Sequence, residues 1–362
     1  MFEKIKRYIE KKKFYTKTFG KKFLDENGVL TIPEGVEVLS HNMFKENGKI
    51  KKVVCPKSLK LIGSGAFKRC FHLEEIVFNE GLETIGSKAF KGCFNLKNVS
   101  FPSTLKNINY ESFTKCMAIE KLTIPKSVIC IQPDAFKDCK GLKDVDIQAR
   151  IEKIEPYTFA FSRIENLTLP EGLKEIDKKA FLFNSIKQIN FPESLEKIGD
   201  GAFFGNRLEN IYFFPGMKEI GDSAFKECFN LVLAYVPDTV EKIGAHAFQS
   251  DVNLRYIHLP KNLSVLEEGV FDGCVKFKEL EIPENVITIE SNAINMKGIE
   301  KLVFKGEPKN ISQDSIITTW VQKVENMPES CEITQKEDGL FYLAPKENNL
   351  LSMDNQKQEM SE

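Results

Sequence analysis

The sequence predicts a β-rich α/β repeat solenoid, a fold in which one short unit is stacked many times. A marker phenylalanine, usually preceded by alanine, returns every 22 or 23 residues from Phe44 to Phe271, and Ile294 and Ile316 continue the series. Each unit also contains an apolar–polar alternation, as in residues 98–101, and proline follows it in most units. Such a period is typical of units that bury apolar surface only against their neighbours.

Length and composition exclude several classes of protein. A chain of 362 residues ordinarily suggests two or more domains, but repeat proteins grow by adding units. Basic residues number 51 and acidic residues 52, so no global field favours nucleic acid. No apolar run is long enough to predict a membrane span. The first twenty residues lack the continuous apolar stretch of a secretory signal, so we expect a cytoplasmic protein, with the cell surface or secretion as the alternative.

Residues 1–28 are predicted to form a basic helical cap over the open end of the first repeat. Phe2, Ile5 and Ile9 recur at the spacing of an amphipathic helix. Lysine and arginine outnumber glutamate by nine to two in residues 1–22. A stacked array must cover its terminal apolar surface, which favours the cap. Attachment of this segment to an anionic membrane or to nucleic acid is the alternative.

Residues 29–316 are predicted to form about twelve repeats of 22–23 residues. Val99 and Phe101 alternate with Asn98 and Ser100, which places the first pair inside and the second pair outside a strand. Strands one repeat apart should then stack in parallel, about 4.8 Å apart. Proline follows the inward pair because it has no N–H group to donate to a sheet. A second short extended piece, and then a turn or short helix containing Ala-Phe, complete the unit.

Cysteine occupies one slot of the repeat, three residues after the marker phenylalanine. The cysteines in this slot are Cys70, Cys93, Cys116, Cys139, Cys228 and Cys274. Other repeats place Asn47, Ser162, Asn184, Asn206 or Asp251 there. Such a slot suits a small side chain that bonds to the backbone within the turn. Stacked cysteines would be close enough for disulfides, but we interpret them as buried free thiols. Single cysteines at this spacing do not form a zinc site, and no metal is predicted.

The repeat cycle Ile-Gly-x-x-Ala-Phe-x-x-Cys-x-x-Leu-x-x-Ile-x-Leu-Pro resembles the BspA-type leucine-rich repeat, also called the Treponema pallidum type. The resemblance covers residues 29–316. It implies a right-handed leucine-rich-repeat superhelix with a parallel concave sheet and short helices or turns on the outer side. It also implies a role like that of many such proteins, which lie on the surface or are secreted and bind host proteins or matrix. The repeat carries no catalytic residues.

The end of the chain departs from the repeat. Residues 317–345 are predicted to form a C-terminal cap with a hairpin, because two extended stretches flank Asp338-Gly339, a turn signal. Residues 346–362 are polar and are predicted to be a disordered tail.

Candidate catalytic groups are few. The four histidines do not recur at one repeat position beside a cysteine or serine slot, so no nucleophile–base pair is predicted. Two pairs of carboxylates, Asp144 with Asp146 and Glu279 with Glu281, point outward from single strands. Paired carboxylates are suited to acid–base chemistry, but on an open sheet we interpret them as solvated charge. We therefore predict no enzyme, no cofactor and no catalytic residue.

The outward strand positions are where a binding function would be encoded, because the inward positions specify the coil. Three consecutive strands gather aromatic residues with polar tips, which binding hot spots commonly use. The alternative is that tyrosine simply suits the surface of a strand. The candidate binding residues are Asn210, Tyr212, Leu233, Tyr235, Tyr256 and His258.

The sequence therefore predicts a non-catalytic scaffold that binds an unidentified protein or peptide on its concave sheet. A surface adhesin that binds host protein or carbohydrate through the same tyrosines is the first alternative. The second alternative is the attachment to membrane or nucleic acid through the basic N-terminus. Nucleic acid is not favoured as a general partner, and no membrane span is expected.

Overall fold

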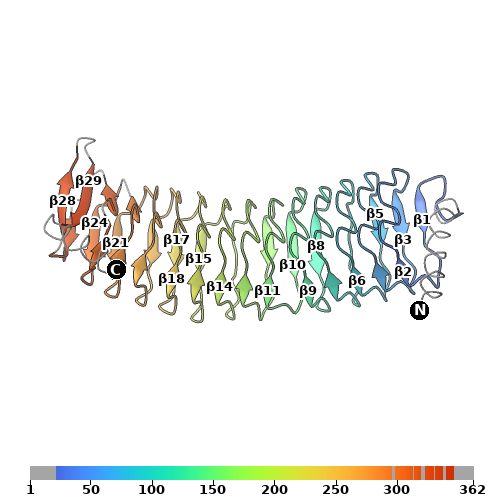
Figure 1. Cartoon of the computed structure of the whole chain (residues 1–362), viewed down its shortest axis with the longest axis horizontal. Coiled ribbons are helices and arrows are strands. Elements are labelled where there is room, and N and C mark those ends of the chain that lie inside the picture. Colours follow the sequence, from blue (N-terminus) through green and yellow to red (C-terminus); the bar gives the residue numbers. More distant parts are fainter. Residues whose placement is uncertain are drawn as a thin grey trace, which may run out of the picture. The chain divides into compact units, whose positions relative to one another are not determined.

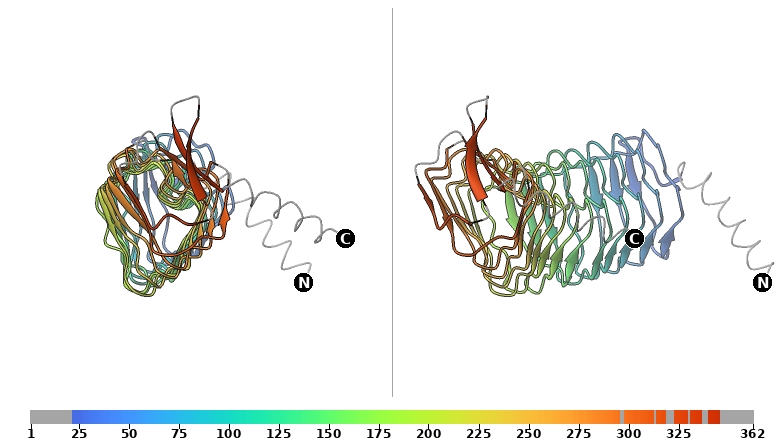
Figure 2. Two further views of the ribbon diagram at one scale, coloured as in Figure 1. Left: turned by 90° about the vertical axis from the view of Figure 1, so that its left-hand side faces the viewer. Right: turned by 60° about the vertical axis from the view of Figure 1, so that its left-hand side comes forward.

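The computed structural model describes residues 22–295, 298–312, 314–318, 323–329, 331–336 and 340–345. The chain divides into two compact units, residues 1–173 and 174–362. Each unit is a parallel-strand solenoid whose coils follow one another along the chain (Figure 1). Most coils contribute a front strand of three or four residues and a back strand of two residues. Within each unit successive coils nearly overlie one another when viewed along the stack (Figure 2).

In the first unit, the front strands form two parallel sheets, in the orders β1-β3-β5 and β12-β10-β8. The front strands are β1 (Val29–Thr31), β3 (Lys52–Val54), β5 (Glu75–Val77), β8 (Lys121–Ile124), β10 (Asp144–Ile147) and β12 (Asn166–Thr168). The back strands are β2 (Val38–Leu39), β4 (Leu61–Ile62), β6 (Thr84–Ile85), β7 (Asn107–Ile108), β9 (Cys130–Ile131) and β11 (Lys153–Ile154). The register pairs equivalent inward residues of neighbouring coils, such as Leu30 with Val53 and Val53 with Ile76.

The second unit repeats this plan. Its front strands are β15 (Asn210–Tyr212), β17 (Leu233–Tyr235), β19 (Tyr256–His258), β21 (Glu279–Ile282), β24 (Lys301–Phe304) and β27 (Lys323–Glu325). Its back strands are β13 (Glu175–Ile176), β14 (Lys197–Ile198), β16 (Glu219–Ile220), β18 (Lys242–Ile243), β20 (Val265–Leu266), β22 (Thr288–Ile289) and β25 (Asn310–Ile311). Parallel pairing of β24 with β27 carries the repeat past residue 316, where the sequence pattern was expected to end.

The turns around the marker phenylalanines contain no helix in the described coils, so the expected short helices and the α/β class are not confirmed. Two residues of a turn take a positive φ, as in Lys88 at 60° and Gly92 at 76°. Backbone N–H groups there donate to the next coil: Lys88 N–H to the Tyr110 carbonyl and Phe90 N–H to the Ser112 carbonyl, both at 2.8 Å. A helix needs donation to the carbonyl four residues earlier, so this pattern excludes it.

The marker phenylalanines form the core of each unit. Their rings stack coil upon coil, with centroids 5.4 Å apart for Phe67 and Phe90 and 5.1 Å apart for Phe90 and Phe113. In the second unit Phe203 and Phe225 stack at 5.6 Å, and all five of these rings are fully buried. Offset stacks of this kind add to the free energy gained by burying each ring.

Cysteines of the repeat slot are free thiols in the structure, as predicted. The Cys93 thiol donates to the Phe67 carbonyl at 3.1 Å, and the Cys139 thiol donates to the Phe113 carbonyl at 3.2 Å. Burial raises the pKa of the Cys139 thiol to about 12, so it stays protonated and able to donate. The thiols therefore hydrogen-bond to the backbone of the turns.

The last strands form a separate four-stranded sheet in the order β23-β26-β29-β28. They are β23 (Ile294–Asn295), β26 (Ile316–Thr318), β28 (Cys331–Gln335) and β29 (Phe341–Pro345). β29 pairs antiparallel with β28 and with β26, whereas β23 and β26 are parallel. The predicted Asp338-Gly339 turn, residues 1–21 of the predicted N-terminal helical cap and the tail at 346–362 lie outside the described residues. Residues 23–28 of that cap are not helical, because the chain turns back there and Leu24 forms an antiparallel bridge with Leu30. Within the described part, no helix has the length and apolarity needed to cross a bilayer.

Candidate binding site

The candidate residues lie on three adjacent front strands of the second unit. Pairing of β15, β17 and β19 is in register, so equivalent residues of the three coils form rows across the strands. The first row is Asn210, Leu233 and Tyr256, and the second row is Tyr212, Tyr235 and His258. The residues between the two rows, such as Ala234, point inward, and Ala234 is buried. The alternation of a strand thus places both candidate rows on one outward face.

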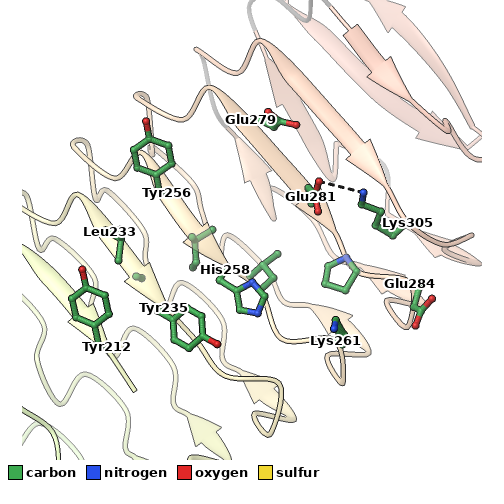
Figure 3. A pocket seen from close by; sticks show the side chains of 14 residues that line it. Tyr212, Leu233, Tyr235, Tyr256, His258, Lys261, Glu279, Glu281, Glu284 and Lys305 are labelled. Carbon is green, nitrogen blue, oxygen red and sulfur yellow. Dashed lines mark ion pairs between the residues drawn. The ribbon is translucent and has the colours of Figure 1, made fainter. Parts of the chain in front are cut away.

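A groove of about 620 Å³ lies on this face. Five of the six predicted residues line it, and Asn210 lies exposed on β15 outside it. Charged residues of the following coils in the same unit form the other side of the groove (Figure 3). The side chains that define the groove are Tyr212, Leu233, Tyr235, Tyr256, His258, Lys261, Glu279, Glu281, Glu284 and Lys305. We call this the tyrosine groove.

Three tyrosines form the aromatic side of the tyrosine groove. Their exposed fractions are 57% for Tyr212, 44% for Tyr235 and 64% for Tyr256, which are high values for residues on paired strands. Tyr235 stacks on His258, with ring centroids 5.0 Å apart and an angle of 11° between the rings. This stack restrains both rings, so a ligand would bind them with little further loss of side-chain entropy.

The histidine of this stack is held by a carboxylate. His258 Nε2 lies 3.4 Å from Asp238 Oδ1, and the Lys261 backbone N–H donates to the same oxygen at 3.0 Å. The Lys261 ammonium lies 3.5 Å from Asp238 Oδ2. The backbone bond from Lys261 is the main reason why the pKa of Asp238 lies below its usual value, and the Lys261 and His258 charges add to it. Asp238 therefore stays ionised and orients His258 at the edge of the groove.

Carboxylates form the other side of the tyrosine groove. Glu281 pairs with Lys305 at 3.2 Å (Figure 3), and Glu279 pairs with Lys301 at 2.6 Å. Glu284 is exposed, and no ion pair to it occurs among the described residues. The sequence had marked Glu279 and Glu281 as an outward pair, but the lysines that neutralise them come from the next coil. Glu279 and Glu281 are thus each held in an ion pair that joins two coils.

The sequence pattern missed one exposed aromatic residue beside the groove. Phe214 follows Phe213 at the end of β15, is 44% exposed, and occupies the place where the next coils have Pro237 and Pro260. The signal was present in the run Phe213-Phe214-Pro215, which shifts the usual proline by one residue. It extends the apolar surface beyond Tyr212.

A second hollow of about 620 Å³ lies in the first unit, where residues 98–101 form no strand. It is lined by Asn98, Ser100, Thr123 and Gln148, among others. These side chains are polar, and no exposed tyrosine lines this hollow. Binding hot spots favour buried or half-exposed aromatic anchors, so the tyrosine groove is the stronger candidate. Among the described residues no group of three or more His, Cys, Asp or Glu side chains could hold a metal ion.

Comparison with known proteins adds a family and a fold. A family model described as a BspA type leucine-rich repeat region, with six copies, matches residues 27–120, 106–232 and 218–342. The chain is similar to the crystal structure of a leucine-rich repeat protein from Bacteroides ovatus, at 23% identity over 82% of each chain, with a TM-score of 0.60. At this identity the likeness shows the fold alone.

Two further solved structures are similar to a lesser degree. A leucine rich cell surface protein from Faecalibacterium prausnitzii is 22% identical over 77% of this chain and 82% of its own, with a TM-score of 0.48. The pneumococcal vaccine antigen PcpA is 23% identical over 79% of this chain and 69% of its own, with a TM-score of 0.47. No curated protein matches the chain.

Proposed function

Because the chain belongs to the BspA-type leucine-rich repeat family, we propose that it is a non-catalytic scaffold that binds another polypeptide in the tyrosine groove. The observation that carries the proposal is the cluster of exposed rings at Tyr212, Tyr235, Tyr256 and His258 in one groove. Repeat solenoids use such extended faces to bind partners, and function depends on the side chains that each coil displays there.

A polypeptide fits the two sides of the groove. Tyrosine supplies a large apolar ring and a hydroxyl, which suits the apolar side chains and the backbone of a bound segment. Glu279, Glu281 and Lys305 supply polar groups at the other side, where a partner's hydrogen bonds would set orientation. A groove of about 620 Å³ falls within the range of small ligand sites, which corresponds to a few side chains of a partner.

The test begins with selection of peptides on the purified protein from a random displayed library. Affinities of the selected peptides are then measured for the variant Tyr212→Ala/Tyr235→Ala/Tyr256→Ala. We expect a loss of at least about 100-fold, because hot-spot side chains each contribute about 1–2 kcal/mol or more. The matched control is Thr31→Ala/Thr123→Ala/Thr168→Ala, which shortens three outward residues on front strands of the first unit and should leave affinity unchanged. Equal affinity of the tyrosine variant and the wild type would disprove the role of the groove.

A carbohydrate ligand is the second candidate, and with it the role of a surface adhesin. The observation that favours it is that exposed tyrosine rings lie beside the acceptors Glu279 and Glu281, since sugars stack on rings and donate hydroxyl protons. A glycan array would decide between the two ligands. Binding of a glycan that is lost in the triple tyrosine variant, with no peptide selected, would favour the adhesin. Detection of the protein on intact cells would be required as well.

A further inference from the structure

The turns of the first unit carry a cluster of cations that the proposed function does not use. In three neighbouring coils, Lys45, Lys68, Arg69, Lys88 and Lys91 gather on one side, and Lys115 follows in the next coil. Only Glu46 and Glu111 oppose them among the same turns. Glu46 lies 3.4 Å from Arg69 and 3.7 Å from Lys45, and Glu111 pairs with Lys88 at 3.2 Å and with Lys91. We call these six cations the basic turn patch.

The basic turn patch is crowded with like charge. Lys68 is half-buried, and no ion pair to it or to Lys115 occurs in the described part of the chain. Desolvation, together with the charges of Lys45, Arg69, Lys88 and Lys91, lowers the pKa of Lys68. Repulsion of this kind opposes folding of the free protein, and an anionic ligand would relieve it.

Exposed phenylalanines border the patch. Phe71 and Phe94 occupy the same position in consecutive coils, are 40% and 39% exposed, and stack with centroids 5.4 Å apart at an angle of 20°. The two rings adjoin the cations directly, because Gly92 lies between Arg69 and Phe94. A Cβ atom added to Gly92 would be 3.4 Å from the Arg69 side chain and 3.8 Å from the Phe94 ring. Met117 continues the apolar ridge in the next coil and is also exposed.

We propose that the basic turn patch and the Phe71–Phe94 ridge bind an anionic lipid surface. Lys68 and Lys115 present hydrogen-bond donors that no carboxylate of the described residues accepts, whereas the other four cations share only Glu46 and Glu111. Lipid headgroups present phosphate and ester acceptors without strong donors, so they match this surface, whereas a polypeptide backbone brings N–H groups that would find no acceptor. Apolar rings beside cations are typical of residues that enter the interfacial layer of a bilayer.

The same geometry argues against nucleic acid. Aromatic residues that bind single strands offer a free ring face on which a base can stack. Phe71 and Phe94 stack on each other, so the ring faces that meet in this stack are closed to a base. A duplex would use the cations but would leave the phenylalanine ridge without a role.

The proposal is tested by flotation of the full chain with vesicles of 70% phosphatidylcholine and 30% phosphatidylglycerol at 50 mM salt. We expect binding that falls steeply at 500 mM salt and is absent with pure phosphatidylcholine. Lys68→Gln/Lys115→Gln removes two cations that make no ion pair in the described residues and should weaken partitioning about 25-fold, at about fivefold per charge. Lys57→Gln/Lys60→Gln changes the net charge equally at exposed positions outside the patch and should have a much smaller effect.

A second pair of variants tests the ridge. Phe71→Ser/Phe94→Ser should weaken partitioning by about tenfold or more, because apolar rings would no longer enter the interface. Phe229→Ser, which changes the equivalent exposed residue of a coil in the second unit, is the control and should bind like the wild type. Circular dichroism and melting temperature show that each variant is folded.

Two results would overturn the proposal. One is vesicle binding that survives Lys68→Gln/Lys115→Gln but is lost when the lysines of residues 1–22 are replaced by glutamine, which would assign binding to the N-terminal segment. The other is failure to bind anionic vesicles while a polyglutamate peptide or a single-stranded oligonucleotide binds. Neither result affects the tyrosine groove, which is tested with peptides.

Discussion

At the scale of the residue, one buried slot shows how different side chains solve the same bonding problem. Asn206 accepts the Ile186 N–H at 3.2 Å and donates to the Phe181 carbonyl at 2.9 Å. Asp251 occupies the equivalent slot and accepts the Cys228 N–H at 2.7 Å through Oδ1. Its Oδ2 is buried without a hydrogen-bond partner among the described residues. A protonated Asp251 carboxyl would supply an O–H donor where Asn206 supplies the N–H donor of its side-chain amide.

The electrostatic surroundings favour that protonated form. Burial raises the pKa of Asp251 well above its usual range, the bond from Cys228 opposes this, and the charge of Glu227 raises it further. The Cys274 thiol of the next coil donates to the Phe248 carbonyl at 3.1 Å. By the repeat spacing of 26 residues, seen for Cys274 and the Phe248 carbonyl, the acceptor for Asp251 would be the Phe225 carbonyl.

Asp251→Asn should therefore raise stability and change its pH dependence. Above about pH 4 the unfolded chain releases this proton while the folded chain retains it, so stability falls as pH rises, by up to about 1.4 kcal/mol per pH unit until the folded pKa is reached. The Asp251→Asn variant has no such proton to release, so it avoids this loss of stability. Urea unfolding at pH 5 and pH 8 measures the effect, and Asn206→Asp should create the same dependence in its own coil. An identical pH dependence in wild type and Asp251→Asn would contradict the assignment.

At the scale of the element, the turn is defined by backbone conformation rather than by glycine. Positive φ recurs at equivalent positions of the turns, two residues before and two after the marker phenylalanine. Non-glycine residues also adopt it, such as Lys88 at 60° and Glu227 at 60°. These residues are exposed or half-buried, and their N–H groups bond to the neighbouring coil, as Glu227 does to the Gln249 carbonyl at 2.9 Å. The coil-to-coil bonds therefore offset a backbone strain of about 1 kcal/mol or more per turn residue.

Substitutions at Glu227 separate the two effects. Glu227→Val should lower the free energy of unfolding by about 1–2 kcal/mol, because a β-branched residue is strongly disfavoured at positive φ. Glu227→Gly should change it by less than about 1 kcal/mol, since relief of strain and greater freedom of the unfolded chain oppose each other. Lys226→Val, at the neighbouring residue of ordinary φ, is the control. Urea unfolding measures the free energy of unfolding of each variant. Equal losses in Glu227→Val and Lys226→Val would show that the positive φ of residue 227 is not the cause of the destabilisation.

At the scale of the whole molecule, each unit is a column of coils in which every coil contacts mainly the next. In the first unit the Phe90 ring lies between Phe67 and Phe113, and its backbone bonds reach the coil of Ser112. Stability in such an array is close to a sum of coils and of their interfaces. Damage should therefore remain local and should decay along the column.

Phe90→Ala should test this locality. The loss of a fully buried ring costs about 3–5 kcal/mol, and the cavity lies between two neighbouring rings. Hydrogen exchange measured by mass spectrometry should quicken in the coils of Phe67, Phe90 and Phe113, and least in the coil of Phe159 of the same unit. A uniform rise over the whole first unit would mean that the unit unfolds as one cooperative body.

Much of the architecture could be predicted because each position of a coil recurs in many repeats of the sequence. Recurrence along the chain predicted the inward pairs, the parallel register and the thiol slot. The family follows from the same recurring residues. The absence of helix could not be predicted, because positive φ falls on residues of many types, such as Lys88, Phe183 and Glu227, and no single residue type marks it. The last parallel strand, β27, was missed because it lies beyond Ile316, the last marker residue, where the sequence pattern was expected to end.

The sequence by itself determined the period, the buried residues of each coil and the rows that face outward, because these follow from local alternation repeated along the chain. Only the tertiary structure decided what those rows form. Tyr235 stacks on His258, Lys305 neutralises Glu281, and Lys68 lies near Lys45, Lys88 and Lys91, in each case through residues of different coils. Contacts between coils depend on side-chain direction and distance in space, which a linear pattern does not contain.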